Sequence, residues 1–273
     1  MRDTAAGDGA ISPARGGASI RVRGLSKTYG RPPRAVHALG PIDFDVAAGE
    51  FVSLIGPSGC GKSTTMLLVA GLEPMTAGRV EIDGRPLTRP LSDVGIVFQD
   101  HLLLEFRTAL GNVMLQQQIR GLDRDRQRAR AAELFARLGL VGAEDRYPWQ
   151  LSGGMRQRVS IARALVHDPS MLLMDEPFGA LDAITRTQIR HDLELLWLDT
   201  RKTVLFITHS IDEAIGLSDR VLVMSPAPGR IVEEIRIDLP RPRPAHLGDY
   251  PEFARYARRI YEIFESLGIY RFR

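Results

Sequence analysis

One stretch of the chain combines residue types that suit the binding of a phosphate chain. The segment GPSGCGKS, from Gly56 to Ser63, fits the pattern G-x-x-x-x-G-K-[ST] at every fixed position. Glycines allow backbone N–H groups to converge on phosphate oxygens, and the compact ammonium of Lys62 suits the β- and γ-phosphates. The hydroxyl of Ser63 is a suitable Mg²⁺ ligand. The alternative is a glycine-rich turn before a core helix.

The residues on either side of this loop favour a nucleoside triphosphate site. EFVSLIG precedes the loop as an apolar strand, and TTMLLVAGL follows it with helical spacing and a closing glycine. The N-terminus of such a helix adds free donors and partial positive charge. Cys60 lies near this terminus and near Lys62, so we expect a lowered thiol pKa and raised reactivity. Alternatively, Cys60 is a small residue in a variable position.

Two further strands end in residues that could hydrolyse the triphosphate. MLLMDEP, from Met171 to Pro177, ends in two carboxylates that point to opposite faces of a strand. Asp175 could therefore hold Mg²⁺ while Glu176 polarises the attacking water; the alternative is a solvated acidic turn. TVLFITHS ends in His209, which could contact the γ-phosphate or serve a structural role.

A second anion site is predicted at QLSGGMRQRVSIARAL. Ser152 and the two glycines after it are typical of a helix N-cap with exposed backbone donors. A head-to-tail homodimer explains why one chain needs two such sites. The loop from Gly56 to Ser63 in one subunit and the Ser152 turn of the other would enclose one nucleotide.

The composition is that of an ordinary globular protein. The chain has 273 residues, of which 44% are hydrophobic and 25% charged, with a net charge of +3. Such a small charge argues against nucleic acid as a partner. No apolar run reaches the ~18 residues of a membrane span, and the single cysteine suits a reducing compartment. Residues 1–19 lack the apolar core of a signal peptide and are expected to form a flexible tail.

Periodicity divides the rest of the chain into strand-rich and helical parts. Residues 20–98 are expected to form strands around the first helix, with EIDGRPL as a hairpin, and residues from about 100 to 165 to form helices. Residues 170–240 alternate between strands and helices. The side chains of one of these helices that should face the core are Ile189, Leu193, Leu196 and Trp197. An α/β nucleotide-binding core with an inserted helical subdomain is therefore expected.

Together these motifs resemble the ATP-binding subunit of ABC (ATP-binding cassette) transporters, from about Ile20 to Leu239. In family order, the matching segments are the Walker A loop at Gly56 to Ser63, the Q-loop at Gln99, the signature at Leu151 to Gln157, Walker B at Met171 to Asp175, the D-loop at Ala180 to Asp182, and the switch histidine at His209. The resemblance implies an α/β P-loop NTPase cassette over residues 20–240. This cassette has a mixed sheet core, an N-terminal antiparallel β part and a helical subdomain at about 100–165.

The resemblance also implies the cofactors and the role of each site residue. ATP and Mg²⁺ are the implied cofactors, and Tyr29 stands where the family stacks an aromatic ring on adenine. The implied nucleotide contacts are Tyr29, Gly56, Pro57, Ser58, Gly59, Cys60, Gly61, Lys62, Ser63, Thr64, Ser152, Gly153, Gly154 and Asp182. The implied metal ligands are Ser63, Gln99 and Asp175, and the implied catalytic residues are Glu176, His209 and Gln99.

Three kinds of ABC protein remain open: an importer subunit, the cassette of a stand-alone exporter or lipid transporter, and a soluble ATPase without a transport role. The segment from Ser225 to Arg243 resembles the nitrate, sulfonate and taurine importers. That resemblance implies a homodimer, separate membrane permease subunits, a periplasmic or lipid-anchored substrate-binding protein and no nucleic acid. It also implies a peripheral position on the cytoplasmic face of the inner membrane. The transported substrate stays open.

Two segments differ from a minimal cassette of that group. Residues 241–273 form a C-terminal extension in which PEFARYARRIYEIFESL predicts one amphipathic helix. We expect it to pack on its own domain, with a dimer contact as the alternative. After Gln99 the group commonly shows a Leu-Pro-Trp-like segment, whereas this chain has Leu104-Glu105-Phe106. Because this region faces the membrane subunit in the family, the partner contact is expected to differ.

Overall fold

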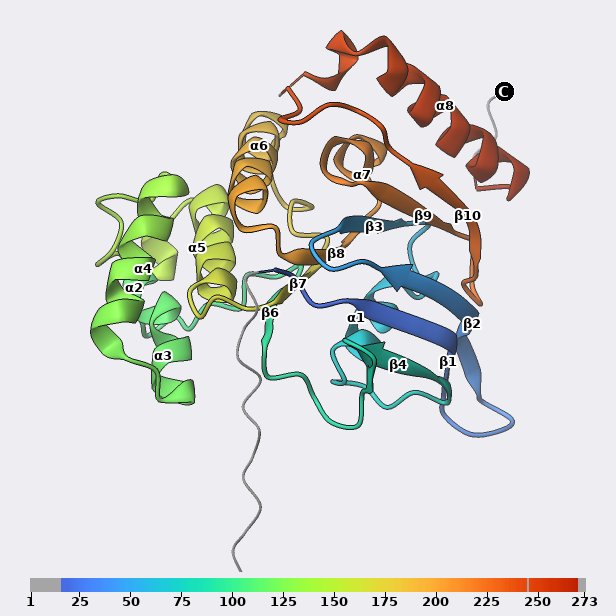
Figure 1. Ribbon diagram of the computed structural model, residues 1–273, viewed down its shortest axis with the longest axis horizontal. Coiled ribbons are helices and arrows are strands. Elements are labelled where there is room, and N and C mark those ends of the chain that lie inside the picture. Colours follow the sequence, from blue (N-terminus) through green and yellow to red (C-terminus); the bar gives the residue numbers. More distant parts are fainter. Residues whose placement is uncertain (1–15, 245, 270–273) are drawn as a thin grey trace, which may run out of the picture.

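Two β-sheets and the helices packed on them make up the structure, which is a computed structural model (Figure 1). It describes residues 16–244 and 246–269. Most of the tail predicted at 1–19 lies outside the described residues. Within its described part, Ala18 is buried and its N–H donates to the carbonyl of Ser170 at 3.3 Å.

The smaller sheet is antiparallel, with the strand order β2-β1-β4-β5. Its strands are β1 (Ile20–Tyr29), β2 (Val36–Val46), β4 (Ala77–Ile82) and β5 (Arg85–Pro86). The hairpin predicted at EIDGRPL is confirmed, because β4 and β5 pair around Asp83 and Gly84. Both turn residues have positive φ, 50° and 73°, as a tight hairpin turn requires.

The larger sheet has the order β10-β9-β3-β8-β7-β6 and is parallel except for β10 at one edge. Its strands are β3 (Phe51–Ile55), β6 (Val94–Val97), β7 (Met171–Asp175), β8 (Thr203–Thr208), β9 (Arg220–Met224) and β10 (Ile231–Arg236). The three strands predicted before the phosphate loop, the carboxylate pair and His209 are confirmed as β3, β7 and β8. All residues of these three strands are buried, which explains their continuous apolar runs.

Helices cover both faces of the larger sheet (Figure 1). On one face, α1 (Lys62–Val69) shares a core cluster with both sheets. On the other face lie α5 (Gly153–Leu165) and α6 (Ala183–Thr200). The predicted helical segment is confirmed as α5 with α2 (Ala109–Val113), α3 (Leu115–Arg120) and α4 (Arg124–Arg137), which gather at one side of the molecule. Two single turns of 3₁₀-helix, η1 and η2, occupy Pro148–Gln150 and Leu247–Asp249.

The predicted core face of α6 and the predicted C-terminal helix are both confirmed. Ile189, Leu193, Leu196 and Trp197 are buried. The C-terminal helix, α8 (Pro251–Ser266), packs against α7 (Ile211–Leu217) on its own domain (Figure 1). The apolar side chains that α8 buries there are Tyr256, Ile260, Ile263 and Phe264. None of the helices in the described part of the chain is long and apolar enough to span a membrane.

Two arginines between β10 and α8 connect α6 with the end of α7. Arg243 is only 2% exposed, and its guanidinium donates to the carbonyls of Ile215 and Ser218. Burial lowers the pKa of Arg243 to about 10. Arg241 forms an ion pair with the buried Glu194 of α6 at 2.9 Å. Removal of either arginine would leave buried polar groups without partners.

The side chain of Cys60 belongs to the core, which corrects the expectation of a lowered pKa. The thiol is 0% exposed and lies in the same apolar cluster as Met66 and Met224. Burial raises the pKa of Cys60, and the Lys62 ammonium offsets this only in part. The loop turns the thiol inward, so any contact of Cys60 with a nucleotide would involve its backbone. A thiol in such surroundings is unreactive.

We therefore expect a maleimide to label Cys60 in the native protein at least about tenfold more slowly than in the urea-unfolded protein. Because Cys60 is the only cysteine, the mass of the intact protein reports the labelling directly. The measurement is a time course by mass spectrometry at the same pH in both states. Equal rates would contradict the buried position of the thiol.

Candidate functional site

The phosphate loop runs from the end of β3 into α1, and its geometry places a buried lysine at the first position of the helix. Gly61, the N-cap of α1, has φ 102°. A β-carbon on Gly61 would lie 2.7 Å from the carbonyl oxygen of Ala38, so only glycine fits there. Lys62 is 5% exposed, and its Nζ donates to the carbonyls of Gly56 and Pro57 at 2.9 and 3.0 Å. The ammonium is thus held inside the curve of the loop.

The register of the parallel strands brings the two carboxylates at the end of β7 to the same edge of the sheet as the phosphate loop. Ile55 pairs with Thr208, and Ile207 pairs with Asp175, so β3, β8 and β7 end side by side. The residues that follow the parallel strands therefore meet at one edge. Glu176 Oε1 lies 4.0 Å from Lys62 Nζ. The structure thus joins the loop and the carboxylate pair, which are far apart in sequence.

Asp175 has the features of a ligand for a divalent cation. The residue is 9% exposed, and its Oδ1 has no hydrogen-bond partner within the described part of the chain. Burial raises its pKa, while a hydrogen bond from the Ser63 side chain and the charge of Lys62 lower it. A buried carboxylate oxygen without a partner is costly unless a ligand completes it. This oxygen and the adjacent hydroxyl fit the oxygen ligands that Mg²⁺ prefers.

Glu176 and His209 form a hydrogen-bonded pair next to Asp175. Glu176 has φ 43°, an uncommon conformation for a residue other than glycine. Its carboxylate Oε2 lies 3.0 Å from His209 Nδ1. Backbone strain of this kind costs of the order of 1–3 kcal/mol and concentrates at functional sites. The strained residue therefore lies where the carboxylate can contact both Lys62 and His209.

Gln99 also reaches this group, from the loop that follows β6. Val97, the last residue of β6, pairs with Met174 of β7, so Gln99 leaves the sheet beside the carboxylates. A β-carbon built on Gly179 would lie 4.0 Å from both the Gln99 amide nitrogen and Glu176 Oε2, so these two side chains approach the same point. Gln99, Glu176, Lys62 and His209 therefore share one site.

Tyr29 lies at the end of β1 with a partly exposed ring, 38% of the residue being accessible. It pairs with Val36 of β2, two residues before Ala38, whose carbonyl contacts the Gly61 turn. The ammonium of Lys27 lies 4.7 Å from the centre of the ring. Backbone pairing thus links the end of β1 to the strand whose Ala38 lies against the phosphate loop.

The Ser152 turn stands apart from this group within one chain. Ser152 is the N-cap of α5, as predicted, and its side chain accepts from the N–H of Met155 at 3.2 Å. A β-carbon on Gly153 would meet no atom within 4 Å, whereas one on Gly154 would lie 2.5 Å from the Thr185 methyl group. Gly153 thus leaves open space, and Gly154 permits close packing of α5 on α6. Among described residues, no hydrogen bond or ion pair joins the Ser152 turn to the phosphate loop.

Asp182, the last residue of the predicted D-loop, is exposed at the start of a helix. Its side chain caps α6 by accepting from the N–H of Thr185 at 3.0 Å. That hydrogen bond lowers the pKa of Asp182. The turn that carries Asp182 follows Glu176 closely in sequence, and the N–H of Gly179 between them donates to the Glu176 carbonyl at 3.1 Å.

Three residues around His209 were missed by the sequence reasoning: Arg186, Thr208 and Glu213. Glu213 is 5% exposed and accepts a hydrogen bond from the hydroxyl of Thr208. The segment Ser210 to Glu213 has the S-x-x-E spacing of a capping box, which would have predicted a local role for the carboxylate. In the structure Ser210 does cap α7, but the Glu213 carboxylate bonds to Thr208 instead.

Comparison with known proteins gives the family. The family model described as ABC transporter matches residues 39–179. The taurine import ATP-binding protein TauB of Rhizobium johnstonii is 46% identical over 239 residues, which cover 85% of this chain and 91% of that protein. The aliphatic sulfonates import ATP-binding protein SsuB of Bacillus cereus is 39% identical over 252 residues, which cover 92% and 98%.

Solved structures agree with this result. The dimeric structure of MJ0796, described as a bacterial ABC transporter cassette, matches with a TM-score of 0.71 and 34% identity, covering 81% of this chain and 99% of that one. A dimeric post-hydrolysis state of the same cassette, bound to ADP and Pi, matches with a TM-score of 0.72 and 33% identity over the same shares. By sequence and by fold, this chain belongs to the ABC transporter family, as an ATP-hydrolysing nucleotide-binding subunit.

Proposed function

We propose that two copies of this chain hydrolyse ATP at their shared interface and thereby drive an importer for a small nutrient of the nitrate, sulfonate or taurine kind. The observation that carries the proposal is the meeting of Lys62, Asp175, Glu176 and His209 at one edge of the sheet. Each group in this cluster has a distinct task in phosphoryl transfer.

The phosphate loop and Tyr29 bind the nucleotide. The backbone N–H groups of the loop and the start of α1 face the phosphates, and Lys62 neutralises the β- and γ-phosphates. The Tyr29 ring stacks on adenine. Ser63, Asp175 and Gln99 hold Mg²⁺, which when bound supplies charge neutralisation to the phosphate oxygens. The free Oδ1 of Asp175 supports this assignment.

Hydrolysis uses Glu176 as the general base. The oxygen of a water molecule attacks the γ-phosphorus, and the bond from that phosphorus to the β–γ bridging oxygen breaks. Its electron pair leaves with ADP, and the proton of the water passes to the Glu176 carboxylate. His209 holds this carboxylate through Nδ1, which leaves Nε2 for the γ-phosphate. Lys62 and His209 therefore both hold the carboxylate of the base.

A head-to-tail dimer explains the separate position of the Ser152 turn. Its open Gly153 and the free backbone donors of α5 close the nucleotide site of the partner subunit, and Asp182 lies at the same interface. The relatives named for taurine and aliphatic sulfonate import, and the segment from Ser225 to Arg243, favour an importer for such anions. We infer a peripheral position on the cytoplasmic face of the inner membrane, separate permease subunits and a substrate-binding protein.

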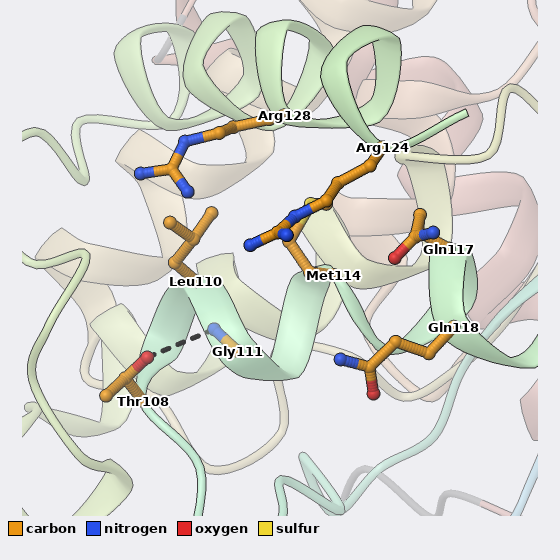
Figure 2. A pocket seen from close by; sticks show the side chains of 8 residues that line it. All are labelled: Thr108, Leu110, Gly111, Met114, Gln117, Gln118, Arg124 and Arg128. Carbon is orange, nitrogen blue, oxygen red and sulfur yellow. Dashed lines mark hydrogen bonds between the residues drawn. The ribbon is translucent and has the colours of Figure 1, made fainter. Parts of the chain in front are cut away.

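The permease-facing surface is proposed on the helical group of α2 to α4. Phe106 is 74% exposed in the segment that differs from the importers of this group. Beside it, a cavity of about 470 Å³ opens between α2 and α4. Figure 2 shows Arg124 and Arg128 extending from α4 over Leu110 and Met114. An apolar floor under two arginines fits a permease segment that carries apolar and acidic side chains.

The cargo is tested by uptake of radiolabelled taurine, an alkanesulfonate and nitrate in cells that lack the chain's gene. Return of uptake with the wild-type chain, and not with Glu176→Gln, would identify the transported anion. Uptake of all three anions without the chain would contradict the importer proposal.

Glu176→Gln tests the general base. The substitution keeps the shape of the side chain but removes the base, so we expect turnover to fall by ~10²–10⁴ while ATP binding persists. Slow hydrolysis should also preserve the ATP-bound dimer. Phosphate release and light scattering after size-exclusion chromatography, each with and without MgATP, measure the two effects. Turnover near that of the wild type would remove Glu176 from this role.

Ser152→Arg tests the position of the turn at the dimer interface. A bulky cation replaces a small donor there, so MgATP-dependent dimerisation and hydrolysis should each fall by at least about tenfold. The affinity of the monomer for a fluorescent ATP analogue should stay within about twofold. Val141→Arg, which adds the same charge at an exposed position, is the control. A matching loss of monomer affinity would place both anion sites in one subunit.

Arg128→Glu tests the docking surface. Reversal of the charge in the cavity should weaken binding to the purified permease by about tenfold or more. The ATPase rate of the isolated chain should not change. Arg126→Glu, on the same helix and outside the cavity lining, is the matched control. Equal effects of the two variants, measured by biolayer interferometry, would exclude a specific role for the cavity.

A further inference from the structure

A buried carboxylate lies one turn beyond His209, and the reaction described above does not use it. Glu213 belongs to α7, is 5% exposed and has a pKa that burial raises above its ordinary value. An ionised carboxylate in such a position is costly unless hydrogen bonds and an opposite charge compensate it. Glu213 has both kinds of partner, one at the end of β8 and one on α6.

The first partner is the hydroxyl of Thr208, which donates to Glu213 Oε2. The same hydroxyl accepts from the N–H of Ser210 at 3.0 Å. The residue between these two is His209. The Thr208 hydroxyl therefore bridges the Ser210 backbone and the Glu213 carboxylate, and so holds the turn that carries His209. The position of the imidazole next to Glu176 Oε2 depends on this turn.

The second partner is Arg186 of α6. Its Nε lies 3.8 Å from Glu213 Oε1 and, although buried, has no hydrogen-bond partner among the described residues. Another nitrogen of the same guanidinium, Nη2, donates to the carbonyl of Leu181 at 2.9 Å. Leu181 directly precedes Asp182, the cap of α6. Arg186 therefore joins the Asp182 turn to the carboxylate that holds the His209 turn.

We propose that Thr208 and Glu213 are positioning residues for His209. Arg186 couples the position of these two residues to the position of the Asp182 turn. The inference rests on the proposed roles of His209 and Glu176. If Asp182 lies at the dimer interface, formation of the dimer changes the position of His209 through a chain of contacts. The competing explanation is that these residues only hold α6 against α7 and have no effect on the position of His209.

Thr208→Val removes the hydroxyl at nearly constant volume and is the central variant. We expect kcat to fall by about 10- to 100-fold, because a small misplacement of a reacting group has effects of this size. The KM for MgATP should stay within about twofold, since the phosphate loop is unchanged. Thr208→Ser keeps the hydroxyl and should restore most of the rate.

Thr203→Val is the matched control. Thr203 is a fully buried residue at the opposite end of β8, and its hydroxyl accepts from the N–H of Gly49 at 2.9 Å. Both valine variants lose a buried hydroxyl from the same strand, so both should lower the thermal midpoint. Only Thr208→Val should lower kcat. Equal losses of kcat in the two variants would overturn the proposal in favour of general destabilisation.

A double-mutant cycle with His209→Ala separates the inference from the proposed mechanism. If Thr208 acts through His209, adding Thr208→Val to His209→Ala should cost no further rate. Losses that multiply would overturn the inference. If His209→Ala alone kept full activity, the proposed role of His209 would fail instead. Full activity of Thr208→Val beside an inactive His209→Ala would overturn only the inference.

Arg186→Gln and Glu213→Gln test the connection to the Asp182 turn. Each should lower kcat by about tenfold or less, with KM unchanged, and the double variant should be no worse than the poorer single variant. Independent, multiplying effects of the two substitutions would show that the ion pair does not connect the two turns.

Discussion

Parallel strand register is the constraint on which the chemistry of this cassette depends. The neighbouring strands β3, β8 and β7 end at Ile55, Thr208 and Asp175, so the residues that follow these strands all lie at the same edge of the sheet. Side chains alternate between the faces of a strand, so a shift of one residue in β7 would turn the Asp175 carboxylate to the opposite face of the sheet. The carboxylate would then lose its hydrogen bond with the Ser63 side chain. The close packing of the buried residues of β3, β7 and β8 on both faces of the sheet opposes that shift.

The site keeps its charges close together before any nucleotide binds. Lys62 is satisfied by carbonyls of its own loop, whereas Asp175 keeps an oxygen without a partner and Glu176 keeps an unfavourable φ. These features are unfavourable in isolation, and the surrounding fold must compensate them. A divalent cation would give the free carboxylate oxygen of Asp175 the partner that it lacks.

Local signals explain what the sequence could predict. The phosphate loop, the Ser152 cap and the apolar face of α8 each depend on residues within a few turns of one another, so spacing and residue type were sufficient. Cys60 was misjudged because its environment is created by Met224, far along the chain. Arg186 and Glu213 were missed for the same reason. Their contact requires α6 and α7 to pack together, and no periodicity in either segment encodes the distance between the two charges.

The close approach of Ala38 to Gly61 has a consequence for how such cassettes can recombine. The carbonyl that would collide with any side chain at position 61 comes from β2, a strand of the other sheet. A loop exchanged between homologues must therefore keep glycine at position 61 wherever β2 follows this path. Replacement of Gly61 by any other residue would instead require β2 to move, so the loop and this strand of the other sheet constrain each other's evolution.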